Sequence, residues 1–108
     1  MSGMPEVQID RMLEHLLRLN ATEVRMVAGL PPRFFRAGRP LPLSGRDLSE
    51  VDVDRLMRCI TPEPAQAALI EHARVAFSFR LGEFGHFDVE LEMIAGMLAM
   101  VIRRRGDE

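Results

Sequence analysis

The last third of the chain alternates apolar and polar residues with a period of two, and this pattern constrains the fold more than any other feature. Every second residue is apolar from Arg74 to Leu81, and the alternation returns from His86 to Met93. A largely apolar run from Met97 to Arg103 follows. Period-two alternation is typical of strands with one buried face. Glycine-containing turns at 82–85 and 95–96 separate the runs, so we predict a three-stranded antiparallel meander.

The apolar positions of the meander also predict how its strands pair. A slip of one residue would place charged side chains in the core. The expected pairs are Phe79 with Val89, Phe77 with Leu91, Leu91 with Met100, and Val89 with Ile102. This register would set Arg80, Asp88 and Arg103 side by side across the outer face of the sheet.

Three helices are predicted before the meander. Apolar residues recur at helical spacing from Glu6 to Asn20, which indicates an amphipathic helix. Ser49, followed by an acidic first turn, predicts the cap of a second helix. We predict that Thr61 caps a third helix, with Pro62 in the first helical position, which runs to about His72.

The stretch GLPPRFFRAGRPLPL, from Gly29 to Leu43, is interpreted as part of a hairpin rather than a linker. Strands are predicted at Glu23–Ala28, Arg33–Ala37 and Leu41–Leu43, with a tight turn at Gly38–Arg39. The prolines place the last of these strands at a sheet edge, because proline cannot donate a ladder hydrogen bond. The predicted order is therefore α-β-β-β-α-α-β-β-β.

Length and composition favour one globular domain over residues 1–108, with flexible tails at 1–5 and 104–108. The net charge of −2 argues against a nucleic-acid partner, which requires a positive field. Cys59 is the single cysteine, which excludes an internal disulfide and suits the reducing cytoplasm. The sequence predicts neither a signal peptide nor a membrane span.

All 14 basic residues are arginine, and the sequence contains no lysine. A phosphate-binding P-loop and a Schiff base both need a lysine, so neither chemistry is expected on this chain alone. The sequence contains no Gly-x-Ser-x-Gly motif and no histidine pair with metal-ligand spacing. We expect no catalytic residue, no cofactor and no metal, and therefore a protein that is not an enzyme.

Asp88, Glu90 and Glu92 share one face of a predicted strand. Paired carboxylates can bind a metal or act as acid and base, but a solvated face balanced by Arg80 and Arg103 is the favoured interpretation. Other single residues are interpreted as structural: His15 on an exposed helix side, Cys59 as a small buried side chain, and Met93, Met97 and Met100 as either core or an adaptable protein-binding surface.

Two segments resemble the N-terminal domain of the type IV pilus retraction ATPase PilT and its secretion-ATPase relatives. ATEVRMVAGLPPRFFRAGRPLPL is similar to the strand, Gly-x-Pro-Pro turn and returning hairpin that open that domain, and VAFSFRLGEFGHFDVELEMIAGMLAMVIRR is similar to its closing meander. The resemblance covers nearly the whole chain. It implies a PAS-like α+β fold, an antiparallel sheet with helices packed on one face.

The chain departs from the family where polar residues matter. The family's Ser-Asp-Leu-His becomes Thr22–Arg25, and its Arg-Phe-Arg-Val-Asn becomes His86–Glu90. In the family, basic residues of this domain help to surround nucleotide held by the motor domain. Their replacement by acidic residues would repel phosphate. The resemblance does not extend to a motor domain with a P-loop, so we expect the fold without the nucleotide contacts.

These observations predict a cytoplasmic, non-enzymatic adaptor or regulatory module that binds proteins, such as pilus or secretion components or their regulators, and that could form a homo-oligomer. Its expected contact residues are Arg80, Asp88, Glu90, Glu92 and Arg103. One alternative is a PAS-like small-ligand sensor, whose candidate lining is Phe34, Phe77, Phe79, Phe87, Val89 and Leu91. Another is the detached N-terminal part of a split traffic ATPase.

Overall fold

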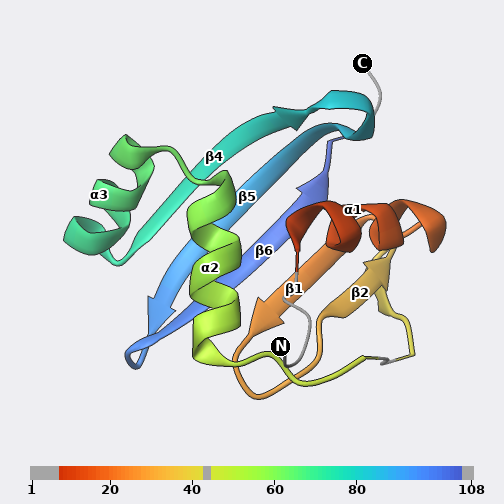
Figure 1. Cartoon of the computed structure of the whole chain (residues 1–108), viewed down its shortest axis with the longest axis horizontal. Coiled ribbons are helices and arrows are strands. Elements are labelled where there is room, and N and C mark those ends of the chain that lie inside the picture. The colour runs from red at the N-terminus through yellow and green to blue at the C-terminus, as the bar shows by residue number, and fades with distance from the viewer. Residues whose placement is uncertain (1–7, 43–44, 106–108) are drawn as a thin grey trace, which may run out of the picture.

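The computed structural model describes residues 8–42 and 45–105, and its elements follow the predicted order (Figure 1). The helices are α1 (Ile9–Arg18), α2 (Glu50–Ile60) and α3 (Glu63–His72), and a short 3-10 turn spans Gly82–Phe84. The strands are β1 (Glu23–Val27), β2 (Arg33–Arg36), β3 (Arg39–Pro40), β4 (Arg74–Leu81), β5 (Gly85–Ile94) and β6 (Met97–Arg104). The α+β fold predicted from the sequence is confirmed.

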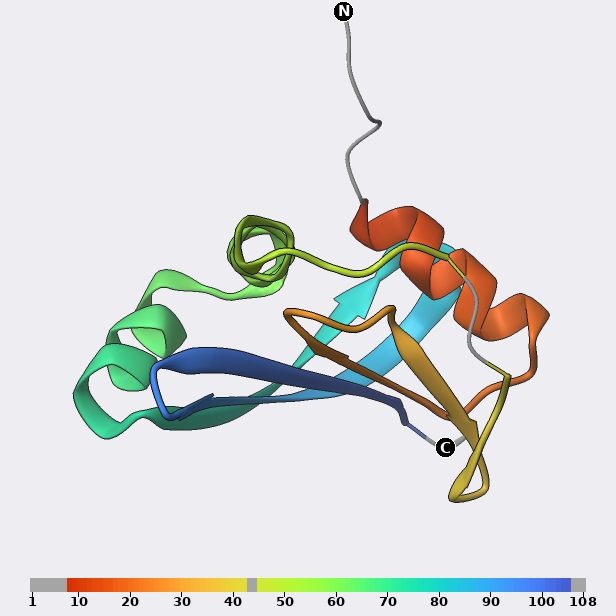
Figure 2. The same ribbon diagram turned by 90° about the horizontal axis from the view of Figure 1, so that it is seen from below.

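The six strands form one antiparallel sheet in the order β3-β2-β1-β6-β5-β4. β1 joins the N-terminal hairpin to the C-terminal meander, because it pairs with β2 on one side and β6 on the other. Figure 2 shows α1 and α2 over one face of the sheet. α3 ends beside β5, where the Met93 N–H donates to the Ala73 carbonyl at 2.8 Å. No helix of the described residues covers the other face.

The core lies between the helices and the covered face of the sheet. Phe87, Val89 and Leu91 alternate along β5 and are at most 1% exposed, as their period-two spacing predicts. Leu13 and Leu16 of α1 are fully buried against the same cluster. Their positions one helical turn apart place both side chains on one face of the helix.

α2 begins with the cap that the sequence predicts. The Ser49 hydroxyl accepts a hydrogen bond from the Asp52 N–H at 3.0 Å, and the Asp52 carboxylate accepts from the Ser49 N–H at 2.8 Å. This reciprocal capping box pairs two donors that the first helical turn leaves free. The prediction that Thr61 caps α3 is wrong: Thr61 ends α2, and Pro62 precedes α3 without a side-chain cap.

The predicted register is right for one hairpin and wrong for the other. Leu91 lies opposite Met100 and Val89 opposite Ile102, as predicted. In the β4–β5 hairpin, however, Phe77 lies opposite Val89 and Phe79 opposite Phe87, a shift of two residues. A two-residue shift keeps every side chain on its own face, so burial cannot distinguish the two registers. The three-residue turn at Gly82–Phe84 decides between them, with Leu81 paired to Gly85.

The N-terminal hairpin closes earlier than predicted. Ala37 and Gly38 take the positive φ angles of the tight turn, at 51° and 82°, so β3 is Arg39–Pro40 rather than a strand at 41–43. Leu41 still donates its N–H to the Phe34 carbonyl, at 2.9 Å. Residue 43, the first residues of the predicted first helix, the predicted tail at 1–5, and residues 106–108 of the predicted tail at 104–108 lie outside the described residues. Arg104, predicted to begin that tail, instead completes β6.

Candidate functional site

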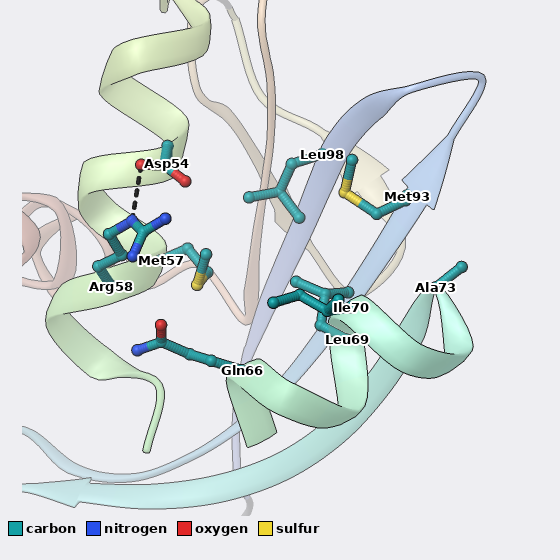
Figure 3. Close-up of a pocket in the computed structure, with 9 residues that line it drawn as sticks. All are labelled: Asp54, Met57, Arg58, Gln66, Leu69, Ile70, Ala73, Met93 and Leu98. Atoms are coloured by element: carbon teal, nitrogen blue, oxygen red, sulfur yellow. Dashed lines mark hydrogen bonds and ion pairs between the residues drawn. The ribbon is translucent and has the colours of Figure 1, made fainter. Parts of the chain in front are cut away.

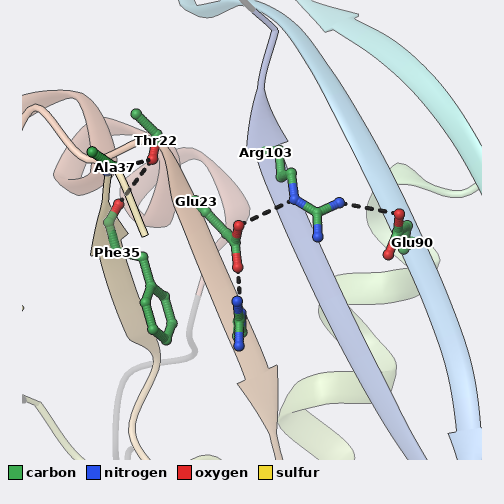
Figure 4. A network of polar contacts seen from close by, with 7 residues as sticks. Thr22, Glu23, Phe35, Ala37, Glu90 and Arg103 are labelled. Atoms are coloured by element: carbon green, nitrogen blue, oxygen red, sulfur yellow. Dashed lines mark hydrogen bonds and ion pairs between the residues drawn. The ribbon is translucent and has the colours of Figure 1, made fainter. Parts of the chain in front are cut away.

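The uncovered face of the sheet carries an ion-pair network centred on Arg103 of β6. The Arg103 Nε donates to Glu23 Oε1 of β1 at 3.1 Å, and its Nη1 donates to Glu90 Oε2 of β5 at 3.1 Å. Figure 4 shows Glu23 and Glu90 on opposite sides of the Arg103 guanidinium. Glu23 also accepts from Arg25, whose guanidinium stacks over the Phe35 ring at 4.2 Å. Three strands are thus linked through charged side chains.

The electrostatic surroundings of Arg103 hold it in the charged form. Partial burial opposes the charge, but hydrogen bonds to Glu90 and Glu23, and their negative charges, outweigh this and raise the pKa of Arg103. The side chains of Arg103 and Glu90 are 42% and 58% exposed. Solvent screens such pairs, so each contributes at most about 1 kcal/mol to stability. The network therefore fixes the pattern of charge on this face more than it stabilises the fold.

Asp88 of β5 forms a second polar cluster on the same face. Its Oδ1 accepts from the Ser78 hydroxyl at 2.8 Å and lies 3.3 Å from Nη2 of Arg105. Arg105 also donates to the Ser78 hydroxyl at 3.3 Å. Ser78 lies directly opposite Asp88 in the β4–β5 ladder, which explains why this short hydroxyl reaches the carboxylate.

The structure brings together only part of the predicted contact set. Asp88, Glu90 and Arg103 lie on the uncovered face. The ion pair of Asp88 is with Arg105, and not with Arg80 or Arg103 as predicted. Arg80 lies opposite His86 because of the two-residue register shift. Glu92 is exposed between Arg74 and Ala99 in the register. The predicted row of Arg80, Asp88 and Arg103 is therefore right for Asp88 opposite Arg103 and wrong for Arg80, because Ser78 takes the place of Arg80 in that row.

Four residues of these clusters were not among the contact residues predicted from the sequence: Glu23, Arg25, Ser78 and Arg105. Alternation along Glu23–Val27 places Glu23 and Arg25 on the polar face of their strand, which is the one signal the sequence offers. It does not reveal that β1 lies next to β6, a contact between residues 80 positions apart.

Apolar side chains interrupt the charges of this face. Ala99 and Val101 of β6 are half-buried there, and Ala76 of β4 is exposed. A shallow hollow of about 360 Å³ lies among Ala76, Ser78, Asp88, Glu90 and Arg103. A mixed apolar and charged surface of this kind can bind a protein through a small apolar contact with a polar rim.

A second concave surface lies on the other side of the molecule, between α2, α3 and the β5–β6 hairpin. It encloses about 450 Å³ and is lined by Met57, Leu69, Ile70, Met93 and Leu98, with Asp54 and Arg58 at α2 (Figure 3). Arg58 donates to Asp54 at 2.8 Å. The Ile70 side chain is 85% exposed, although it is large and apolar.

Two single-residue expectations, for Cys59 and His15, differ from the structure, and the interpretation of the methionines as core or surface divides among the three residues. Cys59 is exposed rather than buried, because it lies on the solvent side of α2. His15 is half-buried, and its ring meets Phe34 edge-to-face at 5.1 Å. Of the three methionines, Met100 is core, Met97 is half-buried and Met93 is exposed.

The described residues can be compared with what a metal site, a small-ligand site and a membrane span would each require. No group of three or more His, Cys, Asp and Glu residues within 8–42 and 45–105 is arranged to hold a metal ion. Four residues of the proposed ligand lining belong to the buried core, and Phe77 and Phe79 pack against it; the four are Phe34, Phe87, Val89 and Leu91. No described helix is long and apolar enough to cross a bilayer.

The sequence matches no protein-family model and no curated protein. Its structure is similar to three solved ATPases. The pilus retraction motor PilT, solved with bound ADP, matches with a TM-score of 0.87 and 26% identity over 95% of this chain. The ATPase DotB from Legionella pneumophila matches with a TM-score of 0.76 and 23% identity over 98%, and DotB from Yersinia pseudotuberculosis with 0.61 and 14% over 94%.

The present chain spans less than a third of each of these proteins, at 30–31% of their length. The two DotB structures support the shared fold. The predicted resemblance to the N-terminal domain of the PilT and secretion-ATPase family is therefore confirmed.

Proposed function

We propose that this chain is a non-enzymatic protein-interaction domain, an adaptor or regulator related to the N-terminal domains of pilus and secretion ATPases. The observation that supports it best is the uncovered sheet face, where Asp88, Glu90 and Glu92 are at least partly accessible around half-buried apolar residues. A partner would bind through this face, in the cytoplasm, as part of type IV pilus motility or polarity control.

The charge of the surface supports a protein partner over a nucleotide. The carboxylates of Asp88, Glu90 and Glu92 follow one strand, two residues apart, and would repel a phosphate chain. Glu90 is already paired with Arg103, and Asp88 with Arg105. A basic or mixed-charge partner can replace these exposed ion pairs with ion pairs to its own side chains at little cost in free energy, because solvent weakens each of the original pairs.

The proposal is tested by reversing charge on this face. Immobilised protein, with and without Asp88→Arg and Glu90→Arg, would be exposed to lysate of the native host, and captured proteins would be identified by mass spectrometry. We expect pilus or secretion components to bind the unmodified chain and to be lost with the double variant. The melting temperature should change by less than about 5 °C, because the altered pairs are exposed.

A matched control reverses two exposed acidic residues on the helices, Glu14→Arg and Glu71→Arg. This variant has the same net charge as the test variant and should capture the same proteins as the unmodified chain. Equal capture by all three proteins would count against the sheet face as the binding site. Tight ATP binding in equilibrium dialysis would instead support the split-ATPase alternative.

A further inference from the structure

The two edges of the sheet are built differently. One edge is β3, which has only two residues, Arg39–Pro40, and Pro42 follows it closely. The other edge is β4, which has eight residues and pairs without interruption to β5. β4 contains no proline, glycine or bulge, so its outer side presents a regular row of backbone N–H and C=O groups.

Edge strands of this kind are normally protected against pairing with another chain. Short length, proline, bulges and charged side chains are the common protective features, and β3 has the first two. β4 has two charged side chains, Arg74 and Arg80, but residues 74–81 form a long strand without proline or a bulge. Figure 1 shows α3 near the start of β4, and none of the strands formed by residues 8–42 and 45–105 lies beyond its outer edge. The sheet is therefore open to extension on this side.

The covered-face side chains of β4 would gain from an added strand. Val75, Phe77, Phe79 and Leu81 point towards the helices but are only half-buried, unlike the fully buried side chains of β5. Phe79 stacks on Phe87 of β5, with ring centroids 5.5 Å apart, and remains partly exposed. Apolar residues at alternate positions of a neighbouring strand would cover this surface.

The side chains on the uncovered face of β4 indicate the charge of a segment that could pair with this edge. Arg74 and Arg80 are exposed, and neither makes an ion pair with any residue of 8–42 or 45–105. They are six positions apart on one strand, about 20 Å at the usual rise per residue. Two acidic residues with the same spacing on an added strand would lie opposite both arginines.

We infer that the outer edge of β4 binds an extended segment of a partner protein as a seventh strand. The segment alternates apolar and polar residues and carries acidic side chains opposite Arg74 and Arg80. A second copy of this chain fits less well: antiparallel self-pairing centred on Ser78 would bring Arg80 of each copy diagonal to Arg74 of the other, about 7 Å apart. The outer backbone of β4 is not part of the site of the proposed function, although Arg74 and Arg80 project from the same uncovered face, where Arg74 lies opposite Glu92.

The inference is tested with the full chain and the acetylated, amidated peptide Glu-Val-Thr-Val-Thr-Val-Glu. Its two glutamates lie opposite Arg74 and Arg80 in either strand direction. In an ¹⁵N NMR titration we expect shift changes centred on β4 and slower exchange of its outward amides. The matched peptide with arginine at both ends should bind roughly two- to thirtyfold more weakly, from two cross-strand charge pairs.

The double variant Arg74→Glu and Arg80→Glu provides the reciprocal control, because both side chains are exposed and the fold should be unchanged. It should bind the arginine peptide more tightly than the glutamate peptide, again by roughly two- to thirtyfold. Failure of both peptides to bind at millimolar concentration would overturn the inference, as would a preference that does not reverse with the variant. Dimerisation of the chain in sedimentation experiments, with β4 protected, would assign the edge to a second copy instead.

Discussion

At the scale of single residues, polar groups are placed by their local hydrogen bonds. Asp52 is 8% exposed, yet its carboxylate accepts hydrogen bonds from the Ser49 N–H and from Arg46 Nη1, the latter at 2.9 Å. These two partners, with Arg46 the larger cause, lower the pKa of Asp52 although burial opposes the shift. The Thr61 hydroxyl, in contrast, is buried without a hydrogen-bond partner among the described residues.

Asp52→Asn is expected to destabilise the protein by about 1 kcal/mol at pH 7, since it weakens the capping box and removes the charge facing Arg46. The folded pKa of Asp52 lies below the unfolded value, so its contribution is complete above about pH 4 and is lost as pH falls through the lowered pKa. Urea unfolding across this pH range should show the difference between the two proteins shrinking in acid.

Asp54→Asn is the control for that measurement. Asp54 lies in the same helix and pairs with Arg58, but its side chain is 50% exposed. The substitution should cost less than about 0.5 kcal/mol. A difference between Asp52→Asn and the unmodified protein that stays constant from pH 7 to pH 2 would contradict the assigned role of the carboxylate.

At the scale of elements, the turns determine where helices and strands end. Ala73 ends α3 in the left-handed conformation, with φ at 64°, and its N–H donates to the Leu69 carbonyl at 2.8 Å. Ala37 and Ala95 adopt positive φ angles of 51° and 53° in the two tight hairpin turns. Alanine is disfavoured in this region because its Cβ approaches the backbone, whereas glycine is not.

Ala73→Gly is therefore expected to stabilise the protein by up to about 1 kcal/mol, because glycine removes the strain of the left-handed C-terminal position. Ala67→Gly, at an exposed interior position of the same helix, should destabilise it by about 1 kcal/mol. Thermal unfolding of the two variants checks the opposite signs. A loss of stability in both would show that Ala73 is not strained.

At the scale of the whole molecule, the sheet holds the chain together through strands that are distant in sequence. β1 and β6 pair along five residues, from Glu23 opposite Arg103 to Val27 opposite Ala99. Both strands have neighbours on each side, whereas β3 and β4 have one neighbour each. The pairing of β1, from the first third of the sequence, with β6, the last strand, therefore lies at the centre of the sheet.

Native-state hydrogen exchange should reflect this arrangement. We expect the amides of β1, β5 and β6 to exchange most slowly, because both sides of these strands are paired. The outward amides of β4 should exchange faster, and those of β3 fastest, since β3 has only two residues at the edge. Protection of the outward β4 amides equal to that of β6 in a monomer would contradict the described sheet order.

Much of this fold could be predicted because the local signals agree with one another. Period-two alternation identified β4 and β5, and the Ser49 and Asp52 pair marked the start of α2. Of the candidate site, the sequence placed Asp88, Glu90 and Arg103 on one face, because alternation assigns each residue a side. Resemblance to a known domain supplied the arrangement of the sheet and helices.

The sequence by itself determined the element types, their order and the face on which the side chains of β4, β5 and β6 lie, since these follow from periods of 3.6 and 2 and from local capping. Tertiary structure alone decided which strands are neighbours and how the β4–β5 hairpin is aligned. The physical reason is that a two-residue shift, or the exchange of one apolar-faced strand for another, leaves burial nearly unchanged. Long-range pairing of β1 with β6 therefore placed Glu23 beside Arg103, a contact that local pattern does not encode.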